Sequence, residues 1–272
     1  MIRALVGTAV MAVGLGVAGA VGDRWLTAVV CFAIVVPLIL LLRRFADRAP
    51  LRTLGLVRPG LVVLGAGVTL LSAAIVFGAG TALGWLRWGT PDWPQLALFL
   101  LTNTVIAFLL EAMPEELVFR GYVFTALPRG LKFAGTLALF TCAALTSNAV
   151  RHLIDPAHPL TFAPAGEDPV AYAVLMAVFG ITLLVARIRT GSLWTCVGLH
   201  LSFLAVNRVV LFGDTRGAGW SAELVAPDAV LLVPAYLLLT AVVLALIPRA
   251  SSVRPGRLRA SRASGLHPSH PC

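Results

Sequence analysis

The sequence predicts an all-α polytopic membrane protein, one bundle of about eight transmembrane helices with both termini in the cytoplasm. Three observations predict this fold class. Of the 272 residues, 59% are hydrophobic and only 12% are charged, a composition far from that of soluble domains. Apolar runs of about 18 residues or more, long enough to span a bilayer, recur along the chain. The basic residues fall mostly on alternate connections between these runs.

The apolar runs define eight candidate spans. They lie near residues 4–22, 26–42, 61–83, 96–110 and onward past 120, 133–150, 169–186, 193–212 and 229–247. We expect the first two spans and the basic loop after them to form an N-terminal hairpin over residues 1–60. The other six form a core over residues 61–248. Residues 249–272 are basic, rich in Pro and Ser and without periodicity, which predicts a disordered cytoplasmic tail.

The basic residues assign the two sides of the membrane. With the N-terminus inside, fifteen fall on cytoplasmic segments and five on outer loops, and Arg120 is left over inside a span. The outer five are Arg24, Arg87, Arg151, Arg208 and Arg216. Attraction of the basic face to anionic lipids therefore explains the net charge of +9 without a nucleic acid partner. Twenty arginines against one lysine suggest a GC-rich genome, and hence a bacterial plasma membrane.

The first span has a second interpretation. An initial basic residue, an apolar run and the small residues Ala18 and Ala20 loosely resemble a secretory signal. Cleavage after that signal would leave the other seven helices in the same orientation.

Three glutamates and an arginine lie in the apolar stretch LLEAMPEELVFRGYVF, residues 109–124. An acidic side chain at the centre of a spanning helix costs about 2.5–3.5 kcal/mol to insert, so these acids need a reason to be there. Glu116 and Arg120 are four residues apart, the spacing of a helical ion pair. Glu115 is turned away from Arg120, and Glu111 lies on the same side as Glu115, without a basic partner in that helix. Because the preceding proline also loosens the helix, we expect a carboxylate to face a polar cavity.

Few other polar side chains lie at membrane depth. The histidines are His152, at the outer end of the fifth span, and His200, inside the seventh; the asparagines are Asn103, Asn148 and Asn207. A single histidine at a helix end is usually a satisfied interfacial residue. Ionisable groups inside a membrane tend to gather in functional cavities, so an unpaired carboxylate and two histidines together predict such a site.

These residues resemble a known family. PEELVFRG resembles the Glu-Glu-x-x-x-Arg motif of the CPBP family, the CAAX prenyl endopeptidases and bacteriocin-processing intramembrane proteases, also called the Abi family. LRTLGLVRP resembles the family's segment before its third helix, and GITLLVARIRTGSLWTCVGLHL resembles its approach to the last catalytic histidine. The comparison covers residues 50–212. It implies that the core over 61–248 is an intramembrane endopeptidase acting on membrane-associated protein or peptide substrates, without a cofactor.

The resemblance also implies roles for individual residues. The first glutamate of the motif and a following histidine activate water, and these roles fall on Glu115 and His152. His200 contributes to the oxyanion hole. Glu116 and Arg120 form the structural pair, in agreement with their helical spacing.

Two positions depart from the family pattern. Asn148 stands where an aromatic residue is expected, in the surroundings of the site, and Leu204 stands where the second oxyanion donor is expected. Asn207, seven residues after His200, is a possible donor. It lies about 10.5 Å along the helix axis from His200, which makes it a poor direct substitute for a donor at position 204.

Other hydrolytic mechanisms are less well supported by the sequence. Glu115, His152 and His200 are plausible zinc ligands, so a metalloprotease is an alternative. The chain lacks the H-E-x-x-H and G-x-S-x-G motifs. Cys196 is four residues before His200, but no residue is evident to orient the histidine for a Cys/His dyad.

Two functions other than peptide hydrolysis remain. A proton-coupled transporter would use Glu111, Glu115 and His152 as a relay, but no inverted repeat is detectable. A self-immunity or scaffold protein would keep the fold with a weakened active site, which Asn148 and Leu204 favour.

Overall fold

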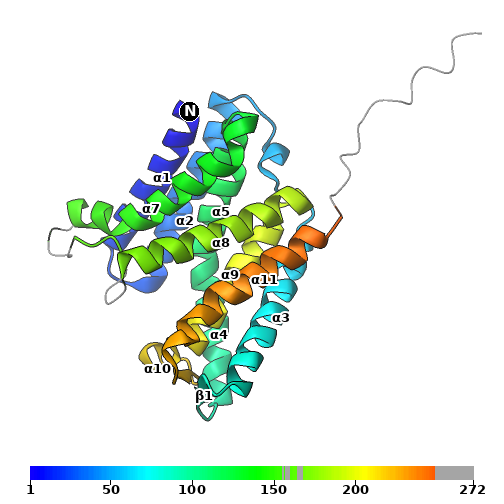
Figure 1. Ribbon diagram of the computed structural model, residues 1–272. Coiled ribbons are helices and arrows are strands. Elements are labelled where there is room, and N and C mark those ends of the chain that lie inside the picture. Colours follow the sequence, from blue (N-terminus) through cyan, green and yellow to red (C-terminus); the bar gives the residue numbers. More distant parts are fainter. Residues whose placement is uncertain (155, 157–159, 164–167, 249–272) are drawn as a thin grey trace, which may run out of the picture.

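The computed structural model describes residues 1–154, 156, 160–163 and 168–248, apart from the side chains of Ser147, Asn148 and Ile154. This part of the chain is a bundle of long helices with one short ribbon of two strands (Figure 1). The long helices are α1 (Ile2–Gly19), α2 (Arg24–Leu41), α3 (Leu61–Ala82), α4 (Trp93–Ala107), α7 (Lys132–Ile154), α8 (Pro169–Thr190), α9 (Leu193–Val210) and α11 (Leu232–Leu246). Strands β1 (Leu86–Trp88) and β2 (Ala222–Leu224) pair antiparallel, with Arg87 opposite Glu223.

Helices coincide with all eight predicted spans. Of the helical stretches within the described residues, seven are long and apolar enough to cross a membrane. The predicted span at 133–150 is also a helix, α7, but it is not one of these seven. The prediction of an all-α polytopic bundle is therefore confirmed. The side assigned to each loop stays a prediction, and the tail 249–272 lies outside the described residues.

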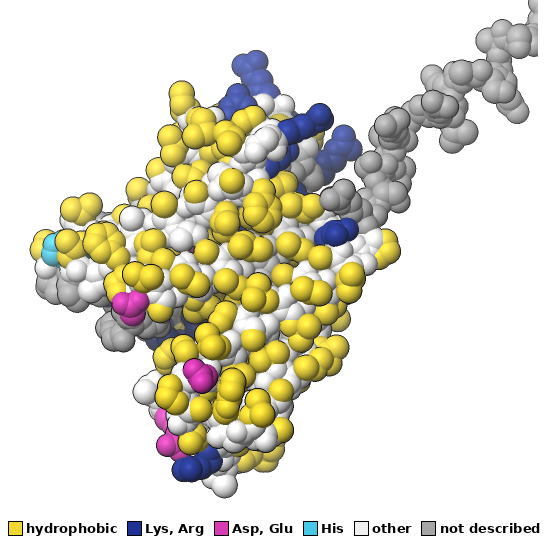
Figure 2. All heavy atoms as spheres, viewed as in Figure 1, with side chains coloured by type: hydrophobic (Ala, Val, Ile, Leu, Met, Phe, Trp, Pro, Cys, Tyr) yellow, Lys and Arg dark blue, Asp and Glu magenta, His cyan; other side chains and the backbone are white. Residues whose placement is uncertain are grey.

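The surface has the character expected of such a bundle. On the face shown in Figure 2, hydrophobic side chains cover most of the molecule. Most arginine and lysine side chains on that face lie at the end where α1 begins, and the acidic side chains lie nearer the opposite end. This polarity is the one that the positive-inside rule produces.

The fourth span is a single helical stretch of 34 residues with an irregular middle. After α4 come a π-helical turn (Phe108–Ala112), α5 (Met113–Glu116), a second π-helical segment (Leu117–Val123) and α6 (Phe124–Ala126). Pro114 has no N–H group to donate to the carbonyl of Leu110, one turn earlier. The thiol of Cys31 in α2 donates to that carbonyl instead, at 3.5 Å. The irregular turns thus lie where the proline interrupts the helix and where the glutamates occur.

Two glycines fix the position of α9 against α3. A Cβ atom at Gly65 would overlap the carbonyl oxygen of Thr195, and one at Gly198 would overlap the carbonyl oxygen of Val62. The two backbones therefore touch, a contact that only residues without side chains permit. Because His200 follows Gly198 by two residues, this contact also sets the depth of His200 in the bundle.

Candidate active site

A cavity of about 790 Å³ opens between the helices that carry the predicted residues. Its wall is mostly apolar and comes from α1, the fourth span, α7, α8, α9 and the segment that leads into α11. The charged and histidine side chains on the wall are Glu111, Glu115, Asp168, His200, Arg208 and Arg216. A carboxylate does face a cavity, as predicted, but the wall is mostly apolar, whereas the sequence predicted a polar cavity.

Glu115 lies half-buried on the wall of this cavity. Its carboxylate forms no hydrogen bond or ion pair with another described residue, unlike those of Glu111 and Glu116. A carboxylate without such partners keeps its oxygen lone pairs free for a water molecule or a substrate.

Glu116, one residue further, is fully buried and has two partners. Its Oε1 atom lies 3.4 Å from Nη1 of Arg120, so the structure contains the ion pair that the helical spacing predicts. The same oxygen lies 2.9 Å from Nδ1 of His200. The Arg120 guanidinium lies 4.0 Å above the centre of the Phe140 ring. The pair predicted on one helix is thus a three-residue cluster that also fixes α9.

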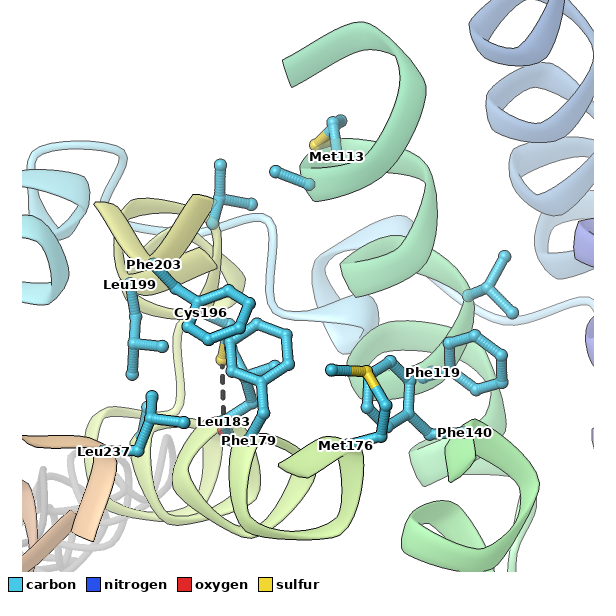
Figure 3. Packing of buried hydrophobic residues seen from close by; sticks show 14 of the residues in the cluster. Met113, Phe119, Phe140, Met176, Phe179, Leu183, Cys196, Leu199, Phe203 and Leu237 are labelled. Atoms are coloured by element: carbon cyan, nitrogen blue, oxygen red, sulfur yellow. Dashed lines mark hydrogen bonds between the residues drawn. The ribbon is translucent and has the colours of Figure 1, made fainter. Parts of the chain in front are cut away.

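His200 is held in place by aromatic rings as well as by Glu116. The His200 ring and the Phe179 ring of α8 pack edge to face, with 4.9 Å between ring centres, and Phe179 stacks on Phe203 at 4.1 Å. Figure 3 shows Phe179 and Phe203 facing one another between α8 and α9. An ionised carboxylate can only accept, so beside ionised Glu116 the Nδ1 atom carries a proton, and the other ring nitrogen, Nε2, is left for chemistry in the cavity.

The thiol of Cys196 is directed away from this chemistry. It is fully buried and donates to the carbonyl of Leu183 at 3.4 Å, the dashed line in Figure 3. Cys196 is not among the residues that line the cavity. The arrangement therefore does not favour a Cys196–His200 dyad, although Glu116 supplies the orienting group that the sequence did not reveal.

His152 occupies a different position from Glu115 and His200. It lies half-buried in the last turn of α7 and is not among the cavity-lining residues. Within the described residues, Glu115, His152 and His200 do not form a group that could hold a metal ion. The side chain of Asn148, one turn before His152, lies outside the described part of the structure.

The two candidate oxyanion positions both lie on the cavity wall. Leu204 presents an apolar side chain there, and Asn207 lies about one turn further along α9. The amide oxygen of Asn207 accepts a hydrogen bond from the Tyr236 hydroxyl at 3.3 Å. This contact leaves the amide N–H groups of Asn207 as its remaining donors.

A second, partly buried ion pair was not foreseen from the sequence. Nη2 of Arg208 lies 2.6 and 2.7 Å from the two carboxylate oxygens of Glu111, and Nη1 donates to Asn103 at 3.0 Å. Assigning Arg208 to an outer loop was wrong, since it lies in the last turn of α9 and reaches inward. Glu111 has no partner in its own helix, as predicted, but it is paired across helices. Of the three glutamates in the fourth span, Glu115 alone lacks a described partner.

The comparison with protein families agrees with this geometry. Residues 95–206 match the family described as type II CAAX prenyl endopeptidase Rce1-like. The matched segment contains most of the fourth span, all of α7 and α8 and most of α9. It includes Glu115, Glu116, Arg120 and His200. No curated protein and no solved structure matches the chain. The resemblance seen in the sequence is confirmed: residues 95–206 of this integral membrane protein are similar to the Rce1-like family.

Proposed function

We propose that this protein is an intramembrane endopeptidase of a bacterial plasma membrane, which hydrolyses peptide bonds of membrane-associated proteins or peptides. The observation that carries the proposal is the unpartnered carboxylate of Glu115 on the wall of an apolar cavity that also contains His200. The Rce1-like domain supports peptide hydrolysis as the reaction class. The apolar wall suits a peptide segment that comes from a membrane protein.

The proposed base is Glu115. Its carboxylate accepts a proton from water, the water oxygen forms a bond to the carbonyl carbon, and a tetrahedral intermediate results. The C–N bond then breaks as the protonated Glu115 gives its proton to the leaving amine. A carboxylate in a partly dry site is a better base for water than one in bulk solvent, which favours Glu115 over an exposed acid.

The proposed electrostatic partner is His200. Glu111, Glu115 and Glu116 together carry three negative charges when ionised, while Arg120 and Arg208 carry two positive ones. Protonation of His200 would make the whole set neutral, which lowers the cost of burying it. In that state Nδ1–H donates to Glu116 and Nε2–H is available to the developing oxyanion. Asn207 is the proposed second donor.

The family resemblance implies that His152 shares the proton with Glu115. Among the described residues, the cavity wall does not include His152. The proposed mechanism therefore assigns the activation of water to Glu115 without requiring His152. A His152→Ala variant tests this difference directly, because it stays active if Glu115 alone is the base and becomes inactive if the two residues share the proton.

The test compares protein termini in the membrane fraction of two strains, one producing the wild-type protein and one producing Glu115→Gln. Glutamine keeps the shape of the side chain and removes its capacity to act as a base. We expect a set of new termini that depends on Glu115, and cleavage of the corresponding synthetic peptides by the purified protein. Identical termini in the two strains, together with no cleavage of a peptide mixture by the purified protein, would refute the proposal.

One observation favours a second candidate. Leu204 places an apolar side chain on the cavity wall four residues from His200, where an oxyanion donor would act. Loss of one such donor commonly lowers the rate by about 10²–10³. A CPBP-fold protein with a scaffold or self-immunity role and residual hydrolysis would have this arrangement. The same comparison of termini separates the two, since a scaffold protein produces no Glu115-dependent termini.

A further inference from the structure

The cavity wall carries positive charge that the proposed hydrolysis does not use. Besides Glu115 and His200, the wall includes Arg208, in the last turn of α9, and Arg216, in α10 (Gly213–Arg216). Both arginines follow the segment matched to the family, residues 95–206. These two charges therefore lie outside the matched segment.

The two arginines differ in their partners. Arg208 is neutralised by the two carboxylate oxygens of Glu111. The Arg216 guanidinium forms no ion pair or hydrogen bond with any residue that the structure describes, and lies 6.0 Å from the Phe212 ring. The wall has two other acids. Glu115 is the proposed base, and Asp168 accepts from the backbone N–H groups of Val170 and Ala171 at the start of α8. Among the described residues, Arg216 is thus a cation on the wall that forms no ion pair with an acid.

The electrostatic surroundings of Arg216 agree with this. Arg216 is an exposed residue, but partial desolvation of its guanidinium lowers the pKa of that group. The nearby charges of Arg208 and Arg24 also lower this pKa, and Glu111 acts in the opposite direction. A bound anion would relieve the repulsion among these arginines. The surroundings therefore favour a negatively charged group beside Arg216.

We propose that Arg216 binds a carboxylate of the peptide substrate and so determines which peptides are cleaved. This inference rests on the proposed peptidase function. A guanidinium holds a carboxylate with two parallel hydrogen bonds, which makes arginine suited to this task. The carboxylate belongs either to the C-terminus of the peptide or to an Asp or Glu side chain, and the two sources share the same chemistry.

The length of α9 sets the position of this carboxylate in the substrate. Eight residues of helix separate His200 from Arg208, about 12 Å along the axis, and Arg216 lies beyond Arg208 in the chain. An extended peptide covers about 3.3–3.6 Å per residue. An extended peptide that reaches from His200 as far as Arg208 therefore covers about four residues.

The test measures peptide binding separately from cleavage. The probes are N-terminally fluorescein-labelled heptapeptides with apolar side chains, made with a free C-terminal carboxylate, with a C-terminal amide, or as the amide with Glu in the last position. Binding is measured by fluorescence anisotropy in a neutral detergent, using Glu115→Gln protein so that no probe is consumed. The same measurement is made on double variants that combine Glu115→Gln with Arg216→Gln, Arg216→Lys or Arg87→Gln. Arg87 is an exposed arginine paired with Glu223 and does not line this cavity, so it controls for net charge.

We expect the free-carboxylate peptide to bind about tenfold more tightly than the amide, the advantage of one charge-assisted contact. Arg216→Gln should remove this advantage, Arg216→Lys should retain part of it, and Arg87→Gln should leave it unchanged. If the amide with Glu in the last position binds tightly, Arg216 recognises a side-chain carboxylate as well as a C-terminal one. If that peptide binds weakly, Arg216 recognises only the C-terminal carboxylate. The proposal would be overturned if protein that retains Arg216 bound the free-carboxylate peptide and the amide with equal affinity. It would also be overturned if the Arg216→Gln protein still bound the free-carboxylate peptide more tightly.

Cleavage of the same peptides by protein with Glu115 intact separates this inference from the proposed function. If the binding advantage depends on Arg216 but no peptide is cleaved, the carboxylate site is supported and the proposed peptidase function is refuted. If the acid and the amide bind with equal affinity and are cleaved at equal rates, the peptidase function is supported and the carboxylate site is refuted. The thermal midpoint of each variant is measured alongside, and because Arg216 is exposed we expect the midpoint to be unchanged.

Discussion

Nδ1 of His200 lies 2.9 Å from Oε1 of Glu116, so a buried carboxylate joins two helices whose contacting residues are 84 positions apart in the chain. The neighbouring carboxylate of Glu115 has no such partner and lines the cavity. Two adjacent and chemically identical residues thus occupy opposite environments, one structural and one available for reaction.

The first prediction separates these two glutamates. Glu115→Gln should accumulate normally in the membrane, keep the wild-type thermal midpoint and lose all cleavage. Glu116→Gln should accumulate poorly or melt early, because it leaves Arg120 buried without its counter-charge, a change that typically costs about 3–5 kcal/mol. Protein level, thermal midpoint in detergent and peptide cleavage are measured for both variants. Equal losses of stability at the two positions would contradict this division of roles.

The second prediction concerns the contact between α3 and α9. Gly65→Ala should lower the thermal midpoint, because the added methyl group meets the backbone of α9 and overpacking of this kind costs about 1–3 kcal/mol. Gly67→Ala, two residues further on the same helix, is the matched control, since its Cβ would meet no atom within 4 Å. If both variants melt at the wild-type temperature, the two backbones are not in contact.

The third prediction concerns the oxyanion site. Leu204→Asn introduces a donor on the cavity wall and should raise kcat with little change in KM, because the new hydrogen bond acts mainly on the transition state. Leu204→Met, of similar volume and without a strong donor, is the control. A fall in kcat, or no gain, would indicate that Asn207 or a backbone N–H group already serves the oxyanion.

The fourth prediction concerns topology. In a background with Cys142 and Cys272 replaced by serine, Thr90→Cys should react with a membrane-impermeant maleimide added to intact cells. Ser251→Cys should react only after the membrane is opened, because the basic residues place the tail in the cytoplasm. Labelling of position 251 from outside would reverse the assigned orientation.

Much of the fold was predictable because its signals are local. Apolar runs of spanning length give the helices directly, since a lipid-exposed backbone must form its hydrogen bonds within its own segment. The Glu116–Arg120 pair follows from the spacing of four residues on a helix. Pro114 predicts an irregular helix because it removes a donor wherever it stands.

Contacts between helices had no such local signal. The sequence indicates that Glu111 lacks a partner in its own helix, but its contact with Arg208 depends on the rotation and depth of α9. The same is true of Glu116 with His200, and of the absence of His152 from the cavity wall. The rotation and depth of a helix depend on how closely its backbone approaches its neighbour, as at Gly65 and Gly198. The sequence shows that these residues are small, but not that two helices touch there. The sequence by itself therefore determined the spans and the ion pair within one helix, because both follow from helix geometry. Only the packing of helices against one another decided which carboxylate has no partner among the described residues.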